Sequence, residues 1–143
     1  MIRPQNIADV MGGVSILGRP IRTLSDLENS IARGLPKRAL RITAERVYDS
    51  AGEARRMMFS IVPEATFKRR TRLSSAESER TERMARVIAA AEYVWDDKND
   101  ARAWLVRPHT ELGGRSPLES ALTELGARRV EALLERLFYG IPG

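Results

Sequence analysis

Apolar residues recur at intervals of three and four along most of this chain, which is the spacing of one face of an α-helix. Near the end of the chain a single apolar stripe would be formed by Val130, Leu133, Leu134, Leu137 and Phe138. The pattern of strict alternation and the Asn-Gly or Asp-Gly turns that mark hairpins are nearly absent. The hydrophobic pattern therefore predicts an all-α fold.

Helix starts are marked by a Ser followed three residues later by a Glu, a pair that satisfies the free N–H groups of a first turn. Such pairs occur at Ser25–Glu28, Ser50–Glu53, Ser74–Glu77 and Ser116–Glu119. Together with the apolar spacing they predict helices at about 25–33, 37–47, 50–60, 63–70, 75–95, 101–105 and 124–139. Helix ends are expected at Gly34, before Pro108 and at Gly140, because glycine favours the left-handed position after a helix and proline cannot continue one.

These elements predict three segments. Residues 1–34 would be an N-terminal arm followed by a short helix, because the stretch to about Arg22 contains Gly and Pro and is weakly periodic. Residues 35–95 would form a helix-turn-helix portion, and the charged run 96–100 would separate it from a small helical domain at 96–143. The Gly pair in the loop 112–116 is interpreted as a hinge, since no strand precedes it and no Gly-Lys-Ser/Thr follows, as a phosphate-binding loop requires.

The positive charge of the chain is local. The formal net charge is +5, and 21 of the 24 basic residues are arginine. Residues 33–72 hold 11 Lys and Arg against 4 Asp and Glu, whereas residues 96–143 hold 7 against 8. Because arginine matches phosphates and base edges with a planar fork of donors, the basic segment predicts an anionic partner for the first half of the chain.

Within the basic segment, two short helices meet at a tight break. The first helix would begin near Ser50, and the break after it would be formed by Ile61 to Pro63. The second helix would be anchored by Phe67. This is the outline of a helix-turn-helix, in which the second helix enters the major groove and nearby cations grip phosphates. The DNA-contact candidates are Thr66, Lys68, Arg69, Arg70 and Arg72. The alternative is a solvated basic helix end that complements the helix dipole.

Several functions are disfavoured. There is no cysteine and a single histidine, His109, so thiolate and multi-histidine metal sites and a thiol nucleophile are excluded. His109 is expected to be an ordinary loop residue, and no convincing pair of carboxylates suggests catalysis. We expect a non-enzymatic protein without cofactor or metal. No stretch resembles a signal peptide or membrane span, which favours the cytoplasm and no membrane partner.

The C-terminal half contains an ordered series of short segments: AWL (103–105), Pro108, GRSPLE (114–119), TELGA (123–127) and VEALLERLFYG (130–140). In this order they resemble the toxin-binding domain of Xre/MbcA/ParS-type antitoxins. Upstream, LGRPIR (17–22), GLP (34–36) and LSSAESER…RMARVIAAAEYVW (73–95) fall where that family has similar segments. The resemblance covers roughly residues 15–143.

The resemblance implies an antitoxin of a type II toxin–antitoxin system. Residues 35–95 would be an Xre-like helix-turn-helix portion that binds operator DNA for autoregulation, and 96–143 the toxin-binding domain. The partner would be a RES-domain toxin that degrades NAD+, neutralised by covering its active site, and the antitoxin would be a homodimer. Candidate toxin-binding residues are Arg115, Arg129, Arg136, Phe138, Tyr139, Gly140, Ile141, Pro142 and Gly143.

Two points stay open from the sequence. The alternative function is a stand-alone helix-turn-helix repressor whose C-terminal half serves to dimerise. The turn before the second helix often carries a glycine, but here Ile61 occupies that place and no Gly occurs between Gly52 and Gly113. Because a β-branched residue tolerates positive φ poorly, either the turn geometry differs or the aligned positions are shifted.

Overall fold

A computed structural model describes residues 2–140, and every regular element in that range is a helix. The all-α prediction is therefore confirmed for the described chain. The helices in chain order are α1 (Pro4–Val10), α2 (Gly13–Leu17), α3 (Leu24–Arg33), α4 (Lys37–Val47), α5 (Ala51–Ile61), α6 (Glu64–Arg69), α7 (Ser75–Trp95), α8 (Lys98–Val106), the 3-10 turn η1 (Thr110–Leu112), α9 (Pro117–Ser120) and α10 (Glu124–Phe138). None of these helices is long and apolar enough to cross a membrane.

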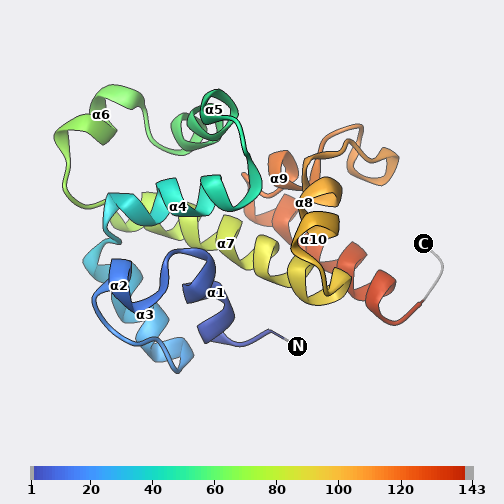
Figure 1. Ribbon diagram of the computed structural model, residues 1–143, viewed down its shortest axis with the longest axis horizontal. Helices are drawn as coiled ribbons and strands as arrows, with labels where there is room; N and C mark the ends of the chain where they lie inside the picture. Colours follow the sequence, from blue (N-terminus) through green and yellow to red (C-terminus); the bar gives the residue numbers. More distant parts are fainter. Residues whose placement is uncertain (1, 141–143) are drawn as a thin grey trace.

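The long helix α7 is the central element. It crosses the middle of the molecule, with α4 to α6 above it, α1 to α3 on one side below and α8 to α10 at the other end (Figure 1). Met84, Val87 and Ile88 of α7 are buried in a single core that includes residues from both halves of the chain. Because α7 packs against α1, α3 and α4 as well as α8 and α10, it joins the two halves through one core.

The N-terminal segment differs from the expected arm. Residues 4–17 form α1 and α2, and α1 packs on α7 with Ile7, Val10 and Met11 buried. These three residues have the i, i+3, i+4 spacing of a helix face, and Pro4 occupies the first helical turn, where its missing N–H costs nothing. Of the glycines that suggested an arm, Gly12 is the N-cap of α2, Gly13 begins this helix and Gly18 is its C-cap.

Three of the four predicted helix starts are confirmed. The hydroxyls of Ser50, Ser74 and Ser116 each accept a hydrogen bond from the N–H three residues on. The prediction at Ser25 is wrong, because α3 begins earlier. Thr23 is its N-cap and forms the reciprocal pair with Asp26, since Asp at this position accepts the Thr23 N–H as Glu does elsewhere.

The segment after α8 turns tightly before α9. Gly113 and Gly114 have φ values of +69° and +81°, and the His109 carbonyl accepts hydrogen bonds from Leu112 and Gly114. Helix α10 ends at Phe138 with Tyr139 as its C-cap, and Gly140 follows with a φ of +67°, the left-handed position expected from the sequence. A close approach fixes the start of α10: a Cβ on Gly126 would overlap the carbonyl oxygen of Ser120.

Candidate functional site

The break between α5 and α6 forms without a left-handed residue. Ile61 is the last residue of α5, and Val62 follows in an extended conformation with φ of −133° and ψ of 124°. Val62 is fully buried, and Pro63 leads directly into α6. The missing glycine therefore reflects a different turn geometry, because an extended residue at this position suits a β-branched side chain.

Helix α6 is held by its one buried side chain. Phe67 meets Phe59 of α5 edge to face, with 6.0 Å between ring centroids. On another side, the Lys37 ammonium of α4 lies 5.0 Å from the Phe67 ring centroid and donates a 3.0 Å hydrogen bond to the Phe67 carbonyl oxygen. These contacts fix α6 on α4 and α5, while its remaining residues face solvent.

The five predicted DNA-contact residues fall into two groups. Lys68 and Arg69 are exposed and form no ion pair or side-chain hydrogen bond within residues 2–140, and Thr66 is half-buried beside them. By contrast, Arg70 forms an ion pair with the buried Glu77, and the Arg72 guanidinium donates a 2.8 Å hydrogen bond to the Gly34 carbonyl oxygen. The DNA contacts of all five stay a prediction, and Arg70 and Arg72 already have intramolecular partners.

The segment after α6 is clamped against the start of α4. The Leu73 N–H donates a 2.8 Å hydrogen bond to the Leu35 carbonyl oxygen, next to an antiparallel bridge between Pro36 and Arg72. Gly34 has a φ of +89°, and a Cβ there would overlap the Leu73 carbonyl oxygen. The orientation of α6 is thus fixed from both of its ends.

In the C-terminal half, three of the predicted toxin-binding residues lie along one groove. The groove has a volume of about 660 Å³ between η1 and α10. Its lining residues are Glu111, Leu112, Arg129, Ala132, Leu133, Glu135, Arg136 and Tyr139. Arg129 donates a hydrogen bond of 2.5 Å to the Glu111 carbonyl oxygen, and Arg136 forms a 3.0 Å ion pair with the Glu111 carboxylate. The Arg136 Nε is buried without a hydrogen-bond partner in the described chain.

An exposed aromatic cluster adjoins the end of α10. The Phe138 ring lies 5.3 Å from that of Tyr93 and 5.1 Å from that of Tyr139. Their exposed fractions are 42%, 46% and 63% respectively. Tyr93 was not singled out from the sequence, which indicated only a helix at 75–95.

The remaining predicted toxin-binding residues are dispersed. Arg115 is exposed on the turn after η1 and does not line the groove. Gly140 follows Tyr139, the C-cap residue of α10. Ile141, Pro142 and Gly143 lie outside the described residues.

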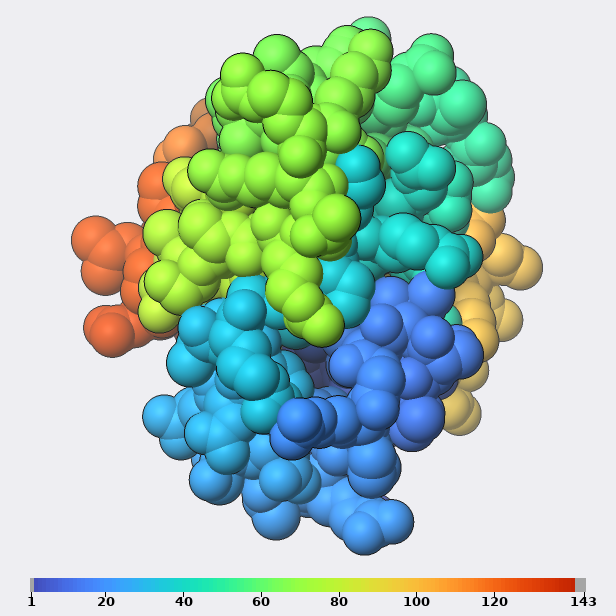
Figure 2. Space-filling model, turned by 90° about the vertical axis from the view of Figure 1, so that its left-hand side faces the viewer, coloured from blue at the N-terminus to red at the C-terminus, as the bar shows by residue number. Residues whose placement is uncertain are grey.

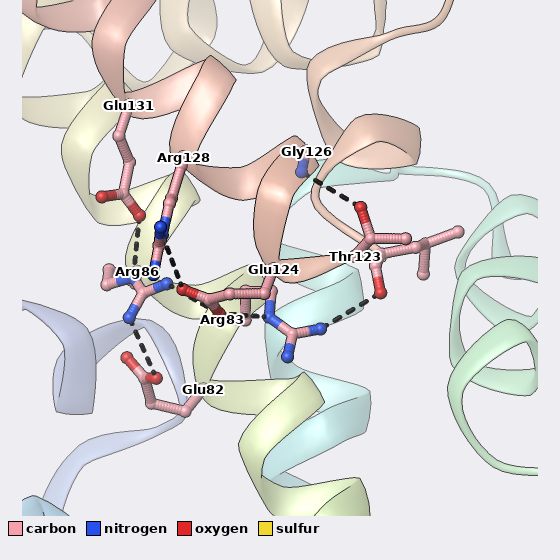
Figure 3. Close-up of polar contacts among 9 residues, drawn as sticks. Glu82, Arg83, Arg86, Thr123, Glu124, Gly126, Arg128 and Glu131 are labelled. Carbon is pink, nitrogen blue, oxygen red and sulfur yellow. Dashed lines mark hydrogen bonds and ion pairs between the residues drawn. The ribbon is translucent and has the colours of Figure 1, made fainter.

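An ion-pair network joins α7 to α10 (Figure 3). The Arg83 guanidinium binds the Glu124 carboxylate at 3.1 Å and the Leu122 carbonyl oxygen at 3.1 Å, while Arg86 binds Glu131 at 2.8 Å. Arg86 also pairs with Glu82 at 3.6 Å. Burial raises the pKa of Glu82 above its usual range, and the charges of Glu131 and Glu124 raise it further against the opposing effect of Arg86. The network fixes the orientation of α10, which lines the groove, on the central helix α7.

His109 has a structural environment. Its ring lies 5.1 Å from the Trp104 ring, and its Nε2 is 3.3 Å from the Trp104 carbonyl oxygen. No group of three or more potential metal ligands occurs in the part of the chain that the structure describes.

Comparison with known proteins matches both halves. The family model described as the antitoxin Xre-like helix-turn-helix domain matches residues 26–86, and that of the antitoxin Xre/MbcA/ParS C-terminal toxin-binding domain matches residues 90–140. The chain is 32% identical over 84 residues to the "Antitoxin Xre" of Pseudomonas putida, covering 56% of this chain and 53% of that protein. It is 41% identical over 78 residues to the "Antitoxin Xre" of Yersinia enterocolitica, covering 52% of this chain and 53% of that protein. The chain thus spans about half the length of the curated relatives it matches. Because the two family models follow each other along most of its length, the chain belongs to the Xre/MbcA/ParS-type antitoxins.

Proposed function

We propose that this chain acts in the cytoplasm as the antitoxin of a type II system and neutralises a RES-domain, NAD+-degrading toxin by covering its active site. The observation that carries the proposal is the groove beside α10, where Arg129, Arg136 and Tyr139 converge. Arginine and tyrosine are enriched among the residues that dominate protein–protein binding energy. The side chains that line the groove therefore favour its use as a binding surface for a partner protein.

Neutralisation by this surface needs no chemistry in the antitoxin. An interface of ordinary size buries roughly 1,600 Å² in total, more than the groove alone provides. The aromatic cluster of Tyr93, Phe138 and Tyr139 extends the surface past the end of α10. A toxin docked over both would lose access to NAD+ if this contact lies across its substrate cleft.

We further propose that α6 enters the major groove of operator DNA, so that the chain represses its own transcription. Lys68 and Arg69 are the free cations on α6, and Thr66 lies beside them. A homodimer would place two copies of α6 about one helical turn of DNA, roughly 34 Å, apart. Size measurement with and without a two-fold symmetric duplex tests the dimer.

The first experiment is co-expression with the neighbouring reading frame, with growth and intracellular NAD+ as readouts. The proposal expects the neighbour to be toxic and this chain to restore both growth and NAD+. Arg129→Ala combined with Tyr139→Ala should abolish the rescue. Arg128→Ala is the matched control, because Arg128 is 70% exposed and forms only a 3.7 Å pair with Glu124 on its own helix.

The outcomes separate the two candidate functions. Toxicity without rescue, or no toxicity from the neighbour, would contradict the antitoxin proposal. Binding of the upstream DNA by the same preparation would then favour the stand-alone repressor. Equal loss of rescue in the Arg128→Ala variant would contradict the assignment of the groove as the contact surface.

A further inference from the structure

We propose that α4 supplies a second row of phosphate contacts, made by Arg38 and Arg41, so that bound DNA lies across both α4 and α6. This inference rests on the proposed DNA binding of the helix-turn-helix. It assigns residues outside the pair α5 and α6, and no comparison with known proteins assigns them.

Helix α4 carries a cationic stripe on its outer side. Its inner face buries Ala39, Leu40, Thr43, Ala44 and Val47. Arg38 and Arg41 are exposed on the opposite side, one turn apart, and form no ion pair or hydrogen bond through their side chains within residues 2–140. Side chains three residues apart on a helix are neighbours, so the two guanidinium groups are available to one partner.

The stripe adjoins the proposed recognition helix. The Arg41 guanidinium carbon lies 5.8 Å from the centroid of the Phe67 ring, the buried anchor of α6. Lys37 contacts the same ring from the first turn of α4. The face shown in Figure 2 presents α6 and the segment to about residue 80 in green, with atoms of α4 in cyan and teal beside them. A duplex that meets α6 on this face also passes α4.

The need for further cations follows from the contacts of Arg70 and Arg72. Their bonds to Glu77 and to the Gly34 carbonyl oxygen leave Lys68 and Arg69 as the free cations at the end of α6. Two copies of α6 in the proposed homodimer would bring four such cations, fewer than the roughly 6–10 phosphate contacts of a protein whose DNA binding depends strongly on salt.

Acidic residues do not cancel the row. Glu64 stands at the start of α6, and Glu45 follows on the α4 stripe, one turn beyond Arg41. The four free cations of α4 and α6 therefore outnumber these two carboxylates, which favours a polyanion over an acidic patch of a mixed-charge protein.

The experiment measures binding of the full chain to a labelled 30-base-pair duplex of random sequence by fluorescence anisotropy from 50 to 200 mM salt. Arg38→Gln/Arg41→Gln should reduce the slope of log affinity against log salt by roughly 2 for each copy of the chain bound, and so by about 4 for the proposed homodimer, because each phosphate contact contributes about 0.9. Arg38→Lys/Arg41→Lys should retain most of the slope, since the slope depends on the number of phosphates that Lys or Arg neutralises. The matched control is Arg107→Gln/Arg128→Gln, which removes the same charge from exposed positions of the C-terminal half.

The variant Lys68→Gln/Arg69→Gln separates the contacts proposed for α4 from the DNA binding proposed for α6. If this variant loses slope while Arg38→Gln/Arg41→Gln behaves like the control pair, the α4 row is overturned and the proposed DNA binding stands. If the unaltered chain fails to bind both the random duplex and its own upstream DNA, the proposed DNA binding fails and the inference with it. Loss of toxin rescue with unchanged DNA affinity in Arg38→Gln/Arg41→Gln would assign the row to a protein partner and overturn the inference.

Discussion

The Arg46 guanidinium donates two hydrogen bonds of 2.8 Å to the Glu92 carboxylate, one to each oxygen. A third, of 3.2 Å, goes to Asp9. The pKa of Arg46 is raised by the bonds to Glu92 foremost, since they favour its charged form. This arrangement ties α1 and α4 to α7, so the N-terminal layer is fixed to the central helix by charge as well as by apolar packing.

We expect Arg46→Leu to lower the free energy of unfolding by about 1–3 kcal/mol, because Glu92, whose side chain is 17% exposed, loses its partner. Denaturant unfolding measures the loss. Asp49→Asn is the control: it breaks the pair with Arg102, but Asp49 is 84% exposed, and such surface pairs are worth about 0–1 kcal/mol. Equal losses in the two variants would contradict a special role of the Arg46–Glu92 pair.

Gly126→Ala should destabilise the protein by at least about 1–3 kcal/mol, although alanine is the better helix former. The added Cβ would overlap the Ser120 carbonyl oxygen, a backbone atom that cannot rotate away, so α9 and α10 must separate. Thermal unfolding measures the change. Gly52→Ala is the matched control, because Gly52 is also helical and its nearest outside atom is 3.7 Å from the added Cβ. The control should be neutral or stabilising, and the same sign in both variants would contradict the overlap.

Two glutamates of α7 should respond oppositely to replacement by glutamine at neutral pH. Burial works to raise the pKa of Glu77, but hydrogen bonds from Ser74 and the charge of Arg70 outweigh it and hold the pKa below its usual range. The charged form of Glu77 thus stabilises the fold. Glu77→Gln should lower the free energy of unfolding by about 1–3 kcal/mol. Glu82→Gln should leave it unchanged or raise it, since burial raises the pKa of Glu82.

The pH dependence of stability follows from the directions of these two pKa shifts. The contribution of Glu77 is present above the unfolded-state pKa of about 4.3 and is lost as the pH falls through the lower folded-state value. The difference between the unaltered chain and Glu77→Gln should therefore shrink below about pH 4. For Glu82 the sign reverses, so the free energy of unfolding of the unaltered chain should rise relative to that of Glu82→Gln as the pH falls. Parallel curves for the two variants would contradict both assignments.

Much of this fold was predictable because its helix boundaries depend on local chemistry. Ser74 and Ser116 cap through bonds to residues three positions away, which a sequence displays directly. The N-terminal layer was not predictable by the same means. Its Gly and Pro residues interrupt the helical spacing of Ile7, Val10 and Met11, and these side chains find their burial against α7, some 70 residues further along the chain.

The candidate functional residues also divide into those that the local sequence indicated and those that depend on contacts distant in the chain. Residue type and local charge pointed to Lys68 and Arg69, which the structure leaves free. No local signal showed that Arg72 would bind the Gly34 carbonyl, because that bond forms only when the segments before α4 and after α6 meet. The convergence of Arg129, Arg136 and Tyr139 is a matter of helical spacing and was within reach of the sequence, whereas the opposite wall of the groove, from η1, was not.

Tyr93→Ala should weaken toxin binding about 2- to 10-fold although Tyr93 lies on α7 rather than α10. Its ring supports Phe138, and an aromatic pair of this kind is worth about 0.5–1.5 kcal/mol beyond its buried area. Titration of the purified chain with the product of the neighbouring reading frame measures the change. Because Tyr93 is 46% exposed, its loss should alter the melting temperature little. Leu125→Ala serves as control, since Leu125 is 70% exposed and does not line the groove. Unchanged affinity in Tyr93→Ala with a lowered melting temperature would make Tyr93 a structural residue and confine the contact surface to the groove.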